Sequence, residues 1–100
     1  MNAVQLFDLV EADENLEGLG VDKDGLLIKC LNPQLKTRIG LESLADTEWE
    51  DIRAVLVGER EPITLRHMSR VVGYYSMIEN WNKSKIGELE DRQRGNYAVS

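Results

Sequence analysis

The side chains of this sequence most able to do chemistry are a single cysteine, a single histidine and two groups of carboxylates. Cys30 lies in an apolar run with Lys29 as its one basic neighbour, which is typical of a buried, inert thiol. One cysteine excludes an internal disulfide and a cysteine-rich zinc site. His67 has neither a nucleophile elbow nor a second histidine near it, so neither a serine triad nor a zinc-protease motif is indicated.

Both groups of carboxylates have structural explanations. The string Asp22-Lys23-Asp24-Gly25 looks like part of a calcium loop. Aligning Gly25 with the turn glycine of such a loop puts Gly20 at the first ligand position, where a carboxylate is needed. The acids of residues 48–51 fall at the expected start of a helix, where negative charge complements the helix dipole. We therefore expect no metal site and no acid–base catalysis from either group.

A stronger pattern occupies the last third of the chain, in the string RVVGYYSMIENWNKSKIGELEDRQRGNYAV. This stretch resembles the C-terminal tail of anaerobic (class III) ribonucleoside-triphosphate reductases, and the resemblance covers about residues 66–99. In that family an Arg-Val-x-Gly-Tyr segment carries the glycine that loses a hydrogen atom, and a Trp-Asn-x-x-Lys segment and a charged helix follow. The matching positions are Arg70, Val71, Gly73, Tyr74, Trp81, Asn82, Lys85, Glu88, Asp91 and Arg92.

The resemblance implies that Gly73 is the site of a glycyl radical. A backbone Cα radical is delocalised over the flanking amide groups only if that unit can flatten, and glycine has no side chain to hinder this. By resemblance, Arg70 and Tyr74 would shape the loop around Gly73, and the Trp81–Lys85 segment would fix the tail against its support. A radical-SAM activase with an iron–sulfur cluster would install the radical. The chain itself would bind no cofactor and no metal.

Several parts of the reductase family are missing from this sequence. A catalytic barrel with nucleotide sites and active-site cysteines cannot fit in 100 residues. The cysteine pairs that bind zinc before the family's tail are absent, and Ser84 stands where glycine is often found. We therefore expect no independent turnover. The chain would act in trans, as a radical-carrying accessory domain or subunit that docks with an activase or with a reductase-like barrel protein.

Two other interpretations stay open. The chain can be a non-catalytic interaction or regulatory module that retains the tail fold without radical chemistry, or a small helical domain whose resemblance is coincidental. Apolar residues at helical spacing, from Leu65 through Met68 and Tyr75 to Ile78, favour these alternatives. In a continuous helix Gly73 would be a mid-helix glycine, costing about 1 kcal/mol relative to alanine, whereas a radical site belongs in an exposed loop.

The helices and strands that must position these residues can be predicted from the spacing of apolar residues and turn signals. This spacing predicts a small α+β domain, mostly helical, with three to four helices and a weak β-hairpin near residues 26–40. Residues 1–100 form one domain, with an unrecognised acidic part at 1–60 and the reductase-tail-like part at 61–100. A first helix is expected over Val4–Leu16, ended by Gly18 and Gly20, and a second from a Thr47/Glu50 capping box to Gly58. A third is expected to follow Pro62. The last is expected over Lys83–Arg94, with Asn80 or Asn82 as its N-cap, Ile86 and Leu89 facing inward and Gly95 as its stop.

Composition and charge narrow the partners and the location. The net charge is −6, and residues 1–31 carry seven acidic and two basic side chains. An acidic surface repels phosphate backbones, so we expect no nucleic-acid partner. The N-terminus lacks the basic residues of a signal peptide, and no apolar run approaches the ~18 residues of a membrane span. A cytoplasmic protein is therefore predicted, with its oligomeric state left open.

Overall fold

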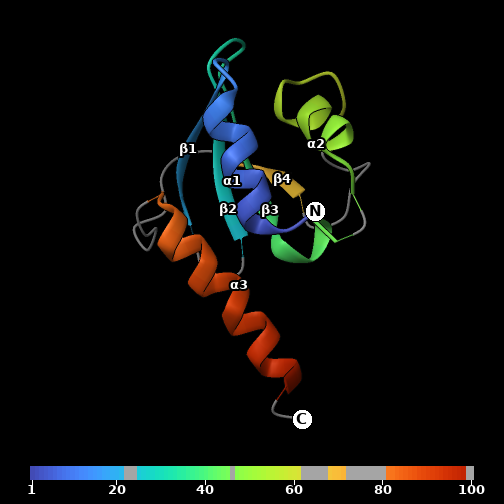
Figure 1. Cartoon of the computed structure of the whole chain (residues 1–100). Coiled ribbons are helices and arrows are strands. Elements are labelled where there is room, and N and C mark those ends of the chain that lie inside the picture. Colours follow the sequence, from blue (N-terminus) through green and yellow to red (C-terminus); the bar gives the residue numbers. More distant parts are fainter. Residues whose placement is uncertain (22–24, 46, 62–67, 72–80, 99–100) are drawn as a thin grey trace.

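A computed structural model describes residues 1–21, 25–45, 47–61, 68–71 and 81–98 of the chain, with side chains described through Asp91. In this part, three α-helices accompany a four-stranded antiparallel sheet and one short 3-10 helix (Figure 1). The elements in chain order are α1 (Ala3–Ala12), β1 (Leu16–Val21), β2 (Gly25–Cys30), β3 (Leu35–Gly40), η1 (Leu41–Ser43), α2 (Trp49–Leu56), β4 (Met68–Arg70) and α3 (Lys83–Ala98).

The sheet is a meander in which neighbouring strands follow one another along the chain, in the order β1-β2-β3-β4. Its register pairs Ile28 with Thr37 and Leu26 with Ile39. Residues paired across two strands lie on the same face of a sheet. This register therefore places Leu26, Ile28 and Ile39 on one face, whereas Leu27 belongs to the other.

The three helices supply the apolar side chains that cover the first of these faces. Each helix contributes buried residues to one cluster with that face. Figure 1 shows α1 lying along the sheet, with α3 crossing beside the N-terminal half of α1. Burying an aliphatic side chain of this size contributes about 1.5–3 kcal/mol, so this single core provides most of the stability. Its fully buried large members are Leu6, Val10, Leu26, Ile28, Cys30, Ile39, Ile52, Val55, Leu56 and Ile86.

The prediction of a mostly helical domain with a weak hairpin is wrong. Residues 26–40 do fold into antiparallel strands, but these are the two central strands of a larger sheet. The error began at Gly18 and Gly20, which were expected to end the first helix and instead lie inside β1, where the pairing with β2 shifts register. Glycine inside a strand marks a bulge or a close approach, and both occur here.

The helix expected through Leu65–Ile78 is also wrong where the structure describes it. Residues Met68–Arg70 form β4, and the backbone N–H of Val71 donates to the carbonyl oxygen of Lys36 at 2.9 Å. Met68 pairs with Ile39 and Arg70 pairs with Thr37. The backbone groups on the outer edge of β3 need hydrogen-bond partners, and β4 supplies them. Over only three residues, the apolar spacing of a helix cannot be distinguished from the alternation of a strand.

Helix α1 begins at Ala3, one residue earlier than expected, because Asn2 and Gln5 form a capping box. The Asn2 side chain accepts from the Gln5 N–H at 2.8 Å, and the Gln5 side chain accepts from the Asn2 N–H at 2.8 Å. This Asn-x-x-Gln spacing is a helix-start signal that can be read from the sequence. The helix ends at Ala12, four residues before the expected end.

The start of α2 differs from the expected capping box. Glu48, rather than Thr47, is the N-cap residue, and no side chain caps the first turn. The acidic residues Glu50 and Asp51 lie in that first turn, where they complement the helix dipole as expected. Gly58 follows the helix with a φ of 86°, a conformation that glycine adopts without strain, which confirms it as the stop.

A better N-cap should stabilise the protein. Aspartate caps helices well because its shorter side chain reaches the N–H groups of the first turn, and it keeps the charge of Glu48. We expect Glu48→Asp to raise the free energy of unfolding by about 0.5–1 kcal/mol in urea titration. Thr47→Ala should leave that free energy unchanged within a few tenths of a kcal/mol. A loss of about 1 kcal/mol in Thr47→Ala would instead return Thr47 to the capping role.

Candidate functional site

The candidate site is the tail-like segment, and its first described member is Arg70 at the end of β4. The Arg70 guanidinium donates to the hydroxyl of Thr37 at 2.5 Å. Thr37 is a buried polar side chain on β3, so this hydrogen bond satisfies a hydroxyl that has little access to water. Arg70, the first of the residues that carry the resemblance, thus ties the edge strand to β3.

Trp81 is the best anchored residue of the segment. Its ring stacks on Phe7 of α1, with ring centroids 5.1 Å apart and planes 25° from parallel. Its indole N–H donates to the carboxylate of Glu11 at 2.8 Å. An ideal Cβ at Gly18 would lie 2.0 Å from the indole ring, so the ring occupies space that only glycine leaves open. The supporting role expected of Trp81 is consistent with these contacts.

Asn82 begins α3. Its side chain accepts from the Lys85 N–H at 2.8 Å, and its carbonyl oxygen accepts from the Ile86 N–H at 3.1 Å. This is the N-cap arrangement expected for Asn82. Lys85 lies in the first turn with its ammonium 3.6 Å from the Glu88 carboxylate, both on the exposed surface. Exposed pairs of this kind contribute about 0–1 kcal/mol.

Helix α3 is fastened to α1 by both apolar and polar contacts. Ile86 and Leu89 face inward and are buried, as expected. The Glu90 carboxylate accepts from the backbone N–H of Ala3 at 2.6 Å, and Lys83 lies 3.3 Å from Asp8. The helix continues to Ala98, so the expected stop at Gly95 is wrong.

The site residues expected from the sequence are therefore brought together only in part. Trp81, Asn82 and Lys85 form one continuous anchor at the start of α3, over the β1 side of the sheet. Arg70 lies on β4 at the opposite edge, three strand positions and about 14 Å away. Gly73 and Tyr74, like His67 and the acids of residues 22–24, lie outside the described residues.

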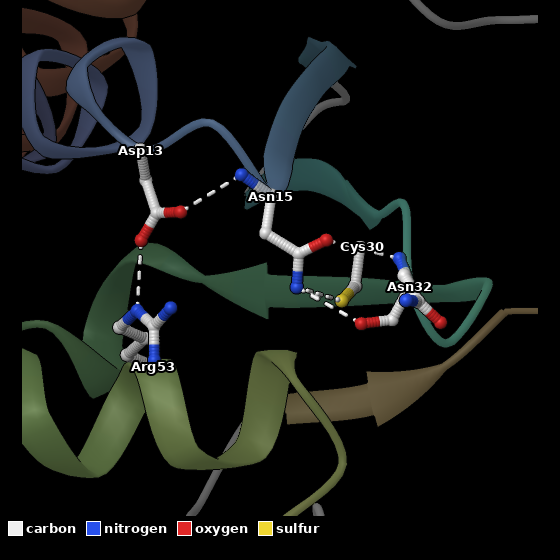
Figure 2. A network of polar contacts seen from close by, with 5 residues as sticks. All are labelled: Asp13, Asn15, Cys30, Asn32 and Arg53. Atoms are coloured by element: carbon white, nitrogen blue, oxygen red, sulfur yellow. Dashed lines mark hydrogen bonds and ion pairs between the residues drawn. The ribbon is translucent and has the colours of Figure 1, made fainter.

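A second polar cluster lies where the end of α1, the last turn of α2 and the β2–β3 turn meet (Figure 2). The Asn15 side chain donates to the Cys30 sulfur at 3.3 Å and to the Asn32 carbonyl oxygen at 3.0 Å, and it accepts from the Asn32 N–H at 3.0 Å. These bonds use both donors and the oxygen of the amide to tie two turns together. Cys30 is buried, as expected, and this cluster is structural.

The same cluster contains a short ion pair between Arg53 and Asp13, with the guanidinium Nε 2.7 Å from the carboxylate oxygen. The hydrogen bond from Arg53 lowers the pKa of the Asp13 carboxyl below its usual value, with a smaller lowering from the Asn15 N–H and an opposing effect of burial. The pair joins the end of α1 to α2. Among the described residues, no three His, Cys, Asp or Glu side chains gather in a way that could hold a metal ion.

A groove of about 740 Å³ separates the outer side of α1 from the start of α2. Its α1 wall includes Gln5 and Leu9, and its α2 wall includes Glu48, Trp49 and Glu50. This volume lies in the usual range of ligand sites. Sequence reasoning did not find the groove, because it depends on how two helices pack and not on a motif.

The first prediction from this geometry concerns Gly18. We expect Gly18→Ala to lower the free energy of unfolding by about 1–3 kcal/mol and to shift the indole N–H resonance of Trp81, because the new methyl group and the ring need the same space. Gly87→Ala is the matched control, since a Cβ at Gly87 meets no atom within 4 Å. This control should stabilise α3 by up to about 1 kcal/mol. Equal effects of the two substitutions would contradict the packing.

The second prediction concerns pH. A carboxyl whose pKa is lowered on folding adds stability that is complete above its unfolded pKa of about 3.9 and is lost as the pH falls through the folded value. We expect the stability difference between the wild type and Arg53→Met to be constant from neutral pH to about pH 5 and to shrink below about pH 4. Denaturant titrations at each pH measure this difference. Arg60→Met, which removes the more exposed Arg60–Asp51 pair, is the control and should show a smaller difference throughout.

Comparisons with known proteins add no relative. No protein-family model, no curated protein and no solved structure matches the chain. No helix in the described ranges is both long and apolar enough to cross a bilayer.

Proposed function

We propose that this protein is a glycyl-radical-type accessory domain that acts in trans with a larger partner and has no turnover alone. The proposal rests on the resemblance of residues 66–99 to the reductase tail, with Gly73 as the radical site. The observation that supports it is the anchoring of the segment on both sides of Gly73. Val71 is bonded to β3, and Trp81 is stacked on α1.

This anchoring suits the chemistry that the resemblance implies. Removing a hydrogen atom from the Gly73 Cα breaks one C–H bond and leaves an unpaired electron on the backbone. The atom would pass to the radical that an activase generates by one-electron reductive cleavage of S-adenosylmethionine. Presenting a single backbone carbon to another protein requires that the chain on each side be held in place. The strand β4 and the Trp81 stack would do this, and the helical arrangement that argued against a radical site does not extend over Met68–Arg70.

A cytoplasmic location, a radical-SAM activase or a reductase-like barrel protein as partner, and the absence of a resident cofactor or metal belong to the same proposal. In this scheme Arg70 keeps the edge strand in register, whereas Trp81, Asn82 and Lys85 fasten the far end of the segment. Tyr74 would line the radical loop by resemblance alone.

The second candidate function is a protein-interaction module that retains this fold without radical chemistry. The groove between α1 and α2 favours it, because an open groove of about 740 Å³ with an indole in its wall is a surface suited to binding. This function makes no use of Gly73.

Electron paramagnetic resonance distinguishes the two candidates. The chain is incubated without oxygen with a class III activase, a reductant and S-adenosylmethionine. We expect a doublet from the remaining Cα hydrogen, which collapses when the protein is grown with Cα-deuterated glycine. Gly73→Ala should abolish the signal, whereas Gly87→Ala, a glycine with open space around it, should retain it. Silence of the wild type with an activase that charges its own reductase would reject the radical function and leave the interaction module.

A further inference from the structure

The groove between α1 and α2 combines apolar and acidic walls. Successive residues of an α-helix are 100° apart, so α1 turns Leu6 and Val10 toward the sheet, Phe7 and Glu11 toward α3, and Leu9 toward α2. Leu9 is half-buried but lies outside the core cluster. Trp49 is also half-buried, with one side packed against the core and another in the groove. The groove therefore offers apolar surface that the fold does not use.

Two of the three carboxylates that line this groove, Glu48 and Glu50, differ from the third, Asp8, which lies 3.3 Å from Lys83, and from the other acids near it. Asp51 pairs with Arg60 and Asp13 pairs with Arg53, each at less than 3 Å. Glu48 and Glu50 are exposed on the groove, and the carboxylate of neither has a hydrogen bond or an ion pair with any residue that the structure describes. Glu48 occupies the N-cap position of α2 and yet does not use its side chain as a cap. Both side chains lie at the positive end of the α2 dipole, which favours their negative charge but leaves their carboxylate oxygens without a hydrogen-bond partner in the described part of the chain.

We propose that this groove binds a short basic segment of a partner protein, one that presents an apolar side chain between lysine or arginine residues. The apolar side chain would lie on Leu9 and Trp49, and the cations would pair with Glu48 and Glu50 at the rim. A lysine or arginine beside the indole face of Trp49 gains a further attraction. Charge complementarity selects the occupant, because an acidic or phosphorylated segment would meet two unpaired carboxylates.

This inference names the partner chemistry of the interaction module proposed above and so rests on that function. It does not depend on Gly73, and Gly73→Ala should bind as the wild type does. The groove and the Trp81 stack use different sides of α1, since Trp81 stacks on Phe7 and the groove lies along Gln5 and Leu9, with Asp8 between them paired to Lys83. One molecule can therefore use both at once.

The test uses a synthetic peptide of lysines and leucines at helical spacing, titrated into the full chain and followed by ¹H–¹⁵N NMR. We expect shifts at Leu9, Thr47 and the indole N–H of Trp49, with the indole N–H of Trp81 unchanged because it is bonded to Glu11. The double variant Glu48→Gln/Glu50→Gln should bind about fivefold or more weakly. The double variant Glu14→Gln/Glu17→Gln removes the same charge away from the groove and should bind like the wild type.

Two further peptides separate the possible failures. A lysine/serine peptide has the same charge without apolar side chains, and a glutamate/leucine peptide has the apolar side chains with the opposite charge. Binding of the glutamate/leucine peptide in place of the basic one would overturn the basic partner but keep the groove as a docking site. Three results would overturn binding in the groove and indicate general charge attraction instead. These are chemical shift changes elsewhere in the chain, equal weakening in both double variants, and equally tight binding of the lysine/serine peptide. No binding of any peptide would overturn both the partner chemistry and the interaction module.

Discussion

The contact of the Trp81 ring with Phe7 and Gly18 is the constraint on which the rest of the structure depends. It joins the start of α3 to α1 and to β1, two elements more than sixty residues earlier in the chain. A stacked aromatic pair contributes about 0.5–1.5 kcal/mol beyond its buried area. Its larger effect is geometric, because the ring leaves no room for a side chain at position 18 and so fixes which residue β1 can carry there. The tail-like part and the acidic part are therefore one folded unit.

The excess of acid in the first third of the chain has a structural use that charge counting did not reveal. Asp8 lies beside Lys83, and Glu11 accepts from the Trp81 indole. Both side chains are exposed, so each contact is weak by itself. Together they match an acidic α1 to a more basic C-terminal third. Farther along the chain, Glu48 and Glu50 add negative charge where α2 begins, and the groove lies there.

The features that could be predicted from the sequence were local. The stop at Gly58, the cap at Asn82 and the inward faces of Ile86 and Leu89 all follow from short-range spacing. The sheet could not be predicted in this way, because β4 exists only to satisfy the edge of β3, and Met68–Arg70 also fits a helical pattern. Gly18 was misread as a helix stop because its partner, Trp81, is distant in sequence.

The same distinction explains what was found and what was missed at the candidate site. The resemblance from Arg70 to Lys85 is a prediction from residue types, and the ends of this segment lie at opposite edges of the sheet, which follows only from the strand order. The groove could not be predicted from a sequence motif, because its walls are formed by separate residues of two helices. Helix α1 connects the two regions, because one side supports Trp81 while another forms a wall of the groove. A change that tilts α1 would therefore alter both together, and Asp8 belongs to both, because it lines the groove and pairs with Lys83.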